Sequence, residues 1–264
     1  MVNLRGFLIG VKIASVQSAM DNLTAAAASG MRSRMESLDM LANNLANASA
    51  PGFKVDREFY STYLAADTTE PPGAEAGSTM PVIERQWTDY SQGAITPTGN
   101  PLDIALKGKG FLVAISPTGP LLTRDGSFRM SPQGVLETTD GLKVRGQDGK
   151  PIQLDPSRQV EITLSGEVRQ DGQTISQIDV VDIKDAHSLS KHGMNYYEFP
   201  SAGVTPASDS QFEPGSIEAA NFQPAESAVR LVSVMRQFEM LQRAVSIGAD
   251  MSRRVVDEVA KVTA

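Results

Sequence analysis

Apolar residues recur at helical spacing near the amino terminus of this 264-residue chain. From Asp21 to about Ala48, apolar positions lie three, four or seven residues apart, which places them on one side of a helix. Asp21 or Asn22 can cap this helix, because a side-chain oxygen there accepts from the free amides of the first turn. Pro51-Gly52 ends it. The predicted apolar stripe consists of Met31, Leu38, Leu41 and Leu45.

The carboxy-terminal segment has a similar pattern. Pro224 suits a first helical turn, and apolar positions at heptad spacing continue to Val262. About 38 helical residues at about 1.5 Å each would extend about 57 Å. Gly248 and Ser252 interrupt the seam, which must be buried against another surface. The seam consists of Leu231, Val234, Phe238, Leu241, Val245, Val255, Val259 and Val262.

The period changes between the two ends. From about Leu102 to Val181, short apolar runs alternate with Asp-Gly and Gln-Gly pairs, which favour tight hairpin turns. The turn spacing allows strands of about five residues. The fold class that we expect is α+β: long N- and C-terminal helices form a coiled-coil-like assembly region, and the centre is a β-rich domain.

Four segments are predicted along the chain. Residues 1–19 are an N-terminal extension that matches none of the family blocks named at the end of this subsection, and either Met1 or Met20 begins the working protein. Residues 20–64 form the N-terminal assembly helix and hinge. Residues 65–214 form the central β-rich domain with flanking linkers, because 65–81 and 199–215 are rich in Pro, Gly, Ser, Thr and Ala. Residues 215–264 form the C-terminal assembly helix.

Composition removes several classes of function. The net charge of -7 argues against nucleic-acid binding, which needs a basic face to displace counterions. The chain has no cysteine, which excludes disulfides, thiolate metal sites and cysteine nucleophiles. No apolar run approaches the roughly 20 residues that a membrane-spanning helix needs. We therefore expect neither nucleic acid nor direct membrane insertion among its interactions.

Candidate catalytic chemistry is sparse. His187 and His192 lie in a polar segment without a carboxylate–histidine metal motif, so surface or turn histidines are the better interpretation. Residues 108–111 (GKGF) lack the spacing of a phosphate-binding loop and lead into a predicted strand, which indicates a tight turn. Trp87 and Tyr90 favour local packing over ligand stacking. We expect no enzyme activity and no catalytic, cofactor-binding or metal-binding residue.

Three asparagines interrupt the end of the first predicted helix. Asn43, Asn44 and Asn47 are mediocre helix formers beside apolar positions. They either terminate the helix before Pro51, or use their amides to bridge backbone and partner groups. We favour a place in an assembly interface, and the terminator alternative stays open.

Three blocks in this order point to a family. Residues 29–54 (SGMRSRMESLDMLANNLANASAPGFK), 92–146 with TRDGSF at 123–128, and 215–245 (GSIEAANFQPAESAVRLVSVMRQFEMLQRAV) resemble the flagellar axial proteins, which comprise rod, hook and hook-associated subunits. The chain lacks the large extra domains of a hook subunit and resembles a basal-body rod subunit of the proximal type. A distal-rod or hook-type subunit is the nearer alternative. A non-polymerising β-domain binding module is the more distant one.

The resemblance implies a mechanism. Such proteins leave through the flagellar type III export apparatus without a cleaved signal peptide and polymerise helically in the periplasm-spanning rod. It implies that this chain binds itself and neighbouring flagellar rod/hook subunits in a helical tubular assembly, with apolar stripes that are buried only there. The expected assembly interface consists of Met31, Leu38, Leu41, Asn43, Asn44, Leu45, Asn47, Leu231, Val234, Phe238, Leu241, Val245, Val255 and Val259.

Overall fold

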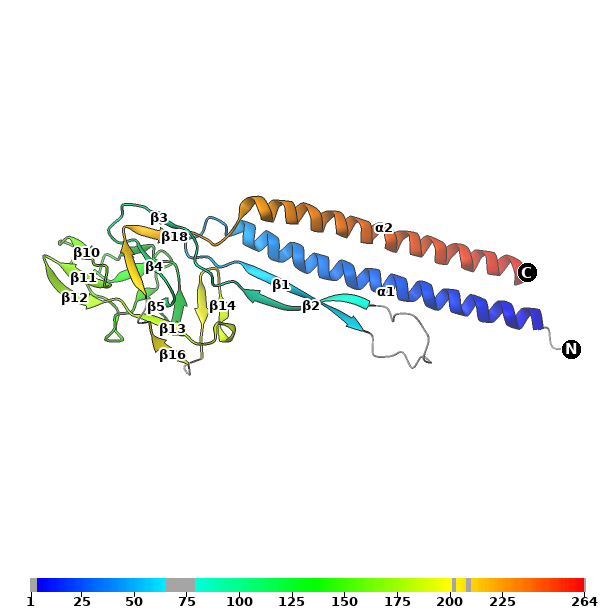
Figure 1. Ribbon diagram of the computed structural model, residues 1–264, viewed down its shortest axis with the longest axis horizontal. Helices are drawn as coiled ribbons and strands as arrows, with labels where there is room; N and C mark the ends of the chain where they lie inside the picture. Colours follow the sequence, from blue (N-terminus) through cyan, green and yellow to red (C-terminus); the bar gives the residue numbers. More distant parts are fainter. Residues whose placement is uncertain (1–3, 65–78, 201–202, 208–209, 264) are drawn as a thin grey trace. The chain divides into compact units, whose positions relative to one another are not determined.

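The computed structural model describes residues 4–64, 79–200, 203–207 and 210–263 (Figure 1). Side-chain environments are described within 24–58, 86–200, 203–207 and 210–254. The described residues contain helices α1 (Leu4–Ala46) and α2 (Pro224–Thr263), a short 3₁₀ helix η1 (Ala186–Ser188), and many short strands.

These elements divide into two compact units that do not follow chain order. The first, here called the helical unit, takes its described residues from 4–42, 57–64, 79–86 and 225–263. The second, the β unit, contains 43–56 and the described residues of 87–224. The last turn of α1 therefore belongs to the β unit.

Small side chains form the buried face of α1 from Ala27 to Ser37, and the large residues Met40 and Leu41 continue it. Ala27, Gly30, Ser33 and Ser37 are all buried, and the Ser37 hydroxyl donates to the Ser33 carbonyl at 2.9 Å. Leu241 of α2 lies so close that a Cβ added at Gly30 would be 3.3 Å from its Cδ1. The two helices therefore pack closely, because α1 presents little side-chain volume at the contact.

The helical unit also contains strands. β1 (Asp56–Leu64) pairs with β2 (Thr79–Thr88) in a two-stranded sheet. Arg230 of α2 forms a 2.6 Å ion pair with Glu58 of β1, whose side chain is buried. This contact fastens the hairpin to α2 within the unit.

The fold-class prediction was wrong about the terminal helices. The chain has two helices within its described residues and a large β-rich part, not a coiled-coil-like region of long N- and C-terminal helices. A heptad seam needs bulky side chains on both helices, whereas Leu241 of α2 packs against Gly30 of α1, and Gly248 of α2 lies close to Thr24 of α1. The β1–β2 hairpin is also part of the same unit, and no periodicity indicated it.

Two local predictions also need correction. α1 begins at Leu4 and continues through Asp21, so neither Asp21 nor Asn22 caps it. Residues 199–215, interpreted as a linker, contain β16 and β17 in their described part. Of the other predicted linker, residues 79–81 belong to β2, and 65–78 lie outside the described residues.

Antiparallel strands build the β unit. The main sheet has the order β14-β15-β6-β5-β9-β8-β7, and β13 pairs with β5 and β16. A three-stranded sheet has the order β10-β11-β12, while β17 pairs with β4 and β18 with β3. The strands are β3 (Ile95–Pro97), β4 (Ile104–Lys107), β5 (Phe111–Ser116), β6 (Gly119–Thr123), β7 (Phe128–Met130), β8 (Leu136–Thr138), β9 (Lys143–Val144), β10 (Val160–Ile162), β11 (Glu167–Gln170), β12 (Gln173–Gln177), β13 (Val180–Ile183), β14 (Ser190–His192), β15 (Tyr196–Glu198), β16 (Val204–Pro206), β17 (Gln211–Pro214) and β18 (Ser216–Glu218).

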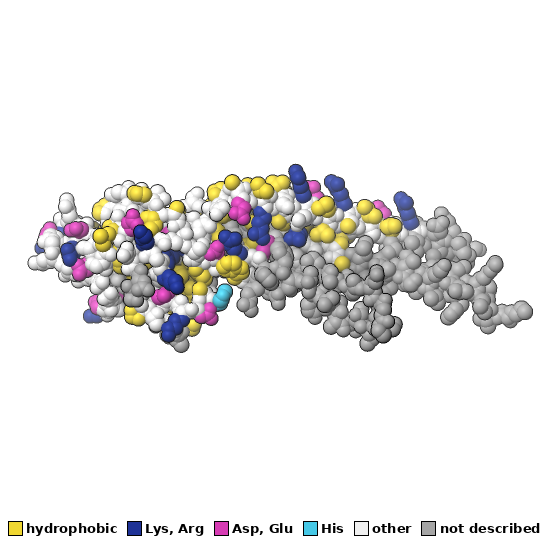
Figure 2. Space-filling view, viewed as in Figure 1, with side chains coloured by type: hydrophobic (Ala, Val, Ile, Leu, Met, Phe, Trp, Pro, Cys, Tyr) yellow, Lys and Arg dark blue, Asp and Glu magenta, His cyan; other side chains and the backbone are white. Residues whose placement is uncertain are grey.

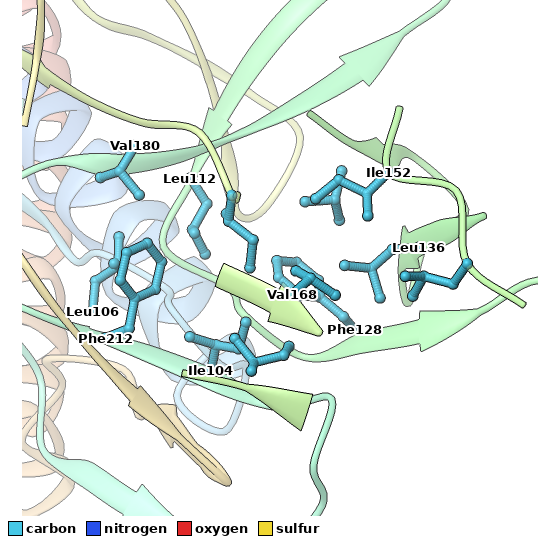
Figure 3. Close-up of a cluster of buried hydrophobic side chains, with 13 residues drawn as sticks. Ile104, Leu106, Leu112, Phe128, Leu136, Ile152, Val168, Val180 and Phe212 are labelled. Atoms are coloured by element: carbon cyan, nitrogen blue, oxygen red, sulfur yellow. The ribbon is translucent and has the colours of Figure 1, made fainter. Parts of the chain in front are cut away.

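One large apolar cluster forms the core of this unit (Figure 3). Its side chains come from strands far apart in sequence: Ile104 and Leu106 of β4 meet Phe212 of β17, and Val168 of β11 joins the same cluster. The strands nearest the carboxy terminus therefore complete a core that the early strands begin. Loss of water from these apolar surfaces, worth about 25 cal/mol per Å², is the main stabilising contribution.

Candidate assembly interface

Three charged side chains meet in the interior of the β unit. Lys54 Nζ lies 2.5 Å from Glu218 Oε1, and Arg124 Nη1 lies 3.2 Å from Glu218 Oε2. The exposed fractions of the three side chains are 0% for Lys54, 4% for Arg124 and 0% for Glu218. Because charges are costly to bury, each of these depends on the others.

Each member of this cluster also ties down backbone. Lys54 donates to the Ser91 carbonyl at 2.7 Å, and Arg124 Nη2 donates to the Gly108 carbonyl at 2.7 Å. Glu218 Oε1 accepts from the Gly93 amide at 2.8 Å. The cluster thus joins the segment after α1, the segment after β6 and the end of β18.

Burial determines the protonation behaviour of the cluster. It lowers the pKa of Lys54 and that of Arg124, and the Glu218 carboxylate opposes both shifts. Burial also raises the pKa of the neighbouring Asp125 carboxyl, against hydrogen bonds from Ser127 that lower it. Glu218 is the carboxylate that pairs with both buried cations, so its charge matters most to the cluster.

Gly52 allows the backbone before Lys54 to pass close to the backbone of Arg124 and Asp125. Gly52 has φ +67°, and a Cβ there would lie 2.3 Å from the Asp125 amide nitrogen. Its own amide donates to the Glu218 carbonyl at 2.7 Å. The positive φ and the close backbone contact both require glycine.

All three predicted asparagines take part in hydrogen bonds within the β unit, and two of them are buried. Asn44 is buried and donates to the Asp56 carbonyl at 2.8 Å, while the Asp56 amide donates to Asn44 Oδ1 at 3.0 Å. Asn47 is also buried and donates to the Asn43 carbonyl at 3.0 Å. Asn43 itself is exposed. Asn44 therefore fixes the start of β1 against the end of α1.

The other predicted residues of α1 lie at different depths. Leu41 is buried, Met31 and Leu38 are half-buried, and the exposed fraction of Leu45 is 49%. Leu45 is thus the predicted apolar residue of α1 that is most available to a partner.

The predicted seam of α2 is covered to a large extent within the chain. Val234 is buried, and the other members with described side chains are half-buried, with Leu241 against Gly30. The half-buried members are Leu231, Phe238, Leu241 and Val245. Val255 and Val259 lie on α2, and their side chains are outside the described environments.

A second set of apolar residues on α2 was missed from sequence. Val229, Met240, Ile247 and Met251 are exposed, and their spacings of 11, 7 and 4 residues are close to three, two and one helical turns. This outer stripe, as we call these four residues, lies on a different side of α2 from Val234. Figure 2 shows hydrophobic side chains alternating with Lys and Arg along the described part of this helix. A period search for a second stripe could have found it.

The other motifs have structural roles. Tyr90 packs edge-on against Phe111 and Tyr197, with ring centroids 5.7 and 5.3 Å apart, which confirms local packing for Tyr90, whereas local packing of Trp87 stays a prediction. His192 Nδ1 lies 2.7 Å from Glu198 Oε1 in a pair that is about half exposed. In the part of the chain that the structure describes, no group of three or more acidic or histidine side chains could hold a metal ion. Among the described helices, none combines the length and apolarity needed to cross a bilayer.

Three family models match the chain, and each covers one member of the charged cluster. The model of flagella basal body rod proteins matches residues 25–54, which include Lys54. That of the flagellar hook protein FlgE/F/G D1 domain matches 105–173, which include Arg124. That of the flagellar basal body rod FlgEFG protein C-terminal region matches 213–258, which include Glu218.

Similarity also extends over whole chains. The flagellar basal-body rod protein FlgF of Caulobacter vibrioides is 30% identical over 249 residues, which span 92% of this chain and 100% of the relative. The chain belongs to the flagellar basal-body rod protein family. FlgF of Mesorhizobium japonicum is 29% identical over 76% of this chain and 83% of its own length. The rod protein FlgG of Caulobacter vibrioides is 27% identical over 85% of this chain and 94% of its own length.

The buried charged cluster connects the three parts of the chain that match the family. The chain is a structural subunit of the flagellar basal-body rod, as the three sequence blocks indicated. Lys54, Arg124 and Glu218, one from each block, meet inside the β unit rather than at a surface. The matched blocks therefore include residues that hold the β unit together.

Proposed function

We propose that the chain is a proximal-rod-type subunit that polymerises by burying exposed apolar faces of its helices against neighbouring rod or hook subunits. The observation that carries this proposal is the outer stripe of α2, which remains exposed although the opposite side of the helix is already covered. Met35 and Leu45 extend the exposed apolar surface to α1.

The outer stripe fits a protein partner better than free solvent. Its four large side chains follow one line along α2, so a neighbouring helix or sheet face could cover them together. Arg236, Arg243 and Arg254 are exposed on the same helix and keep the unassembled chain soluble. A contact between different faces of successive copies propagates without closing, which generates a tubular polymer.

A rod subunit is supported by the similarity to the basal-body rod protein FlgF, which spans the whole length of that relative. The alternative is a distal-rod or hook-type subunit. The remaining features of the proposal are export through the flagellar export apparatus without a cleaved signal peptide, a place in the periplasm-spanning rod, and no catalytic role.

Leu45→Asp tests the role of the helices. A charge at this exposed position leaves the β-unit core untouched, so we expect normal folding and loss of incorporation into the rod. Ala46→Asp is the matched control, because it adds the same charge at an exposed position of the same helix turn, outside the predicted interface. Incorporation of the Leu45 variant at the wild-type level would refute the proposal.

Hydrogen–deuterium exchange separates polymerisation from a non-polymerising binding module. We expect peptides from 24–46 and 224–254 to gain protection when the chain passes from purified monomer to isolated basal bodies. Equal protection in both states would favour the binding-module alternative.

A further inference from the structure

Methionine is prominent on the exposed surface of α2. Of the six large apolar side chains exposed there, Met235, Met240 and Met251 are methionines, and Met240 and Met251 are half of the outer stripe. Their exposed fractions are 60% for Met240 and 56% for Met251. The chain has no cysteine, so thioethers are its oxidisable sulfur groups.

Exposure distinguishes these thioethers from those of Met40 and Met130. Met40 of α1 is 7% exposed on the inner side of that helix, and Met130 packs against the β-unit core. An oxidant in solution therefore reaches Met240 and Met251 much more readily than Met40, because the sulfur must be accessible to react.

We propose that Met240 and Met251 are a reversible oxidation site that controls assembly through the outer stripe, an inference that rests on the proposed function. The oxidant is a hydroperoxide. With hydrogen peroxide, the thioether sulfur attacks one peroxide oxygen, and an S–O bond forms as the O–O bond breaks. The departing hydroxide takes the proton from the transferred oxygen and leaves as water. Methionine loses two electrons and becomes the sulfoxide, while the peroxide is reduced.

The product is poorly suited to an apolar contact. A sulfoxide oxygen is a strong acceptor, and burying it without a donor is costly. The side chains of Val229 and Ile247, the other members of the outer stripe, are hydrocarbons and cannot donate a hydrogen bond to the sulfoxide oxygen. With about a tenfold loss for each sulfoxide, oxidation of both residues weakens association about a hundredfold. Reduction of the sulfoxides restores the apolar stripe.

The experiment uses the full chain with and without hydrogen peroxide. Peptide mass spectrometry measures oxidation at each methionine, and sedimentation velocity over a concentration series measures self-association. We expect Met240 and Met251 to oxidise before Met40, association to weaken about a hundredfold, and methionine sulfoxide reductases for both epimers to restore it.

Two variants locate the effect. Met240→Leu/Met251→Leu keeps the stripe apolar and should associate equally well before and after peroxide. Met194→Leu/Met235→Leu removes the same number of exposed thioethers from outside the outer stripe and should stay sensitive. Loss of association by the peroxide-treated Met240/Met251 variant would overturn the proposal.

The outcomes separate the two proposals. Wild-type chain that associates equally well with verified sulfoxides at both positions refutes the oxidation site alone. Untreated wild-type chain that fails to associate at any concentration refutes assembly through this surface and the oxidation site with it. Faster oxidation of Met40 than of Met240 refutes the accessibility argument directly.

Discussion

Replacing Glu218 with glutamine tests whether the charged cluster holds the β unit together. The substitution keeps the shape and one acceptor oxygen but removes the charge that faces Lys54 and Arg124, both almost completely buried. Removing one partner of a buried ion pair costs about 3–5 kcal/mol, because the other charge is left without compensation. For a domain stabilised by about 5–15 kcal/mol, that is a large fraction of the free energy of unfolding.

The single tryptophan provides the assay. Trp87 is the only one in the chain and belongs to the β unit, so its fluorescence during urea unfolding reports that unit. We expect the urea concentration at the unfolding midpoint of Glu218→Gln to be far below that of the wild type. Glu198→Gln is the matched control: its ion pair with His192 is about half exposed, so its loss should cost under about 1 kcal/mol.

A double-mutant cycle then assigns the energy to the pair. Lys54→Met and Glu218→Gln, measured alone and combined, should show a coupling free energy of about 1–3 kcal/mol in unfolding, because the two side chains meet at 2.5 Å. A loss below about 1 kcal/mol for Glu218→Gln alone would refute the reasoning, because the two cations would then find compensation elsewhere.

The remaining predictions concern backbone geometry, the buried amide and alkaline pH. Gly52→Ala should lower the free energy of unfolding in urea by about 3 kcal/mol or more, because it combines a positive φ with a backbone clash. Gly172→Ala, with open space at φ +78°, should lower the free energy of unfolding by about 1 kcal/mol. Asn44→Ala removes two hydrogen bonds to the partly buried backbone of Asp56 and should cost about 1–3 kcal/mol; a loss as small as that of exposed Asn43→Ala would contradict this. Burial raises the pKa of Tyr90 from 10.0 to about 12, so its contribution to stability is complete below pH 10 and is lost as pH rises to 12. Tyr90→Phe should show a smaller decline of the unfolding free energy over that interval, and equal declines would count against the assignment.

Local pattern predicted the elements better than their partners. The heptad positions of α2 identified a real inner side, since Val234 is buried and Leu241 packs on Gly30. The same pattern could not indicate that α1 would place Gly30 against Leu241, because a glycine gives no hydrophobic period. The start of α1 was missed because Asp21 resembles a cap while the chain simply continues as helix.

The charged cluster was beyond the reach of sequence reasoning. Lys54 and Glu218 are 164 positions apart, and nothing in the residues beside either one indicates the other. The three blocks of the family resemblance contained all the members, but a resemblance of linear segments does not say that they meet in space. Tertiary pairing of β17 with β4 and of β18 with β3 brings them together.

This strand pairing determines when folding can finish. A ribosome delivers the chain amino terminus first, so β3, β4, Lys54 and Arg124 appear long before their partners in β17 and β18. A chain that ends before β17 is therefore expected to show no cooperative Trp87 transition in urea, and a normal transition would contradict this. Until residue 218 arrives, two cations lack their counter-charge and the core lacks Phe212. The carboxy-terminal strands β17 and β18 therefore delay completion of the β unit until the chain has been synthesised to residue 218.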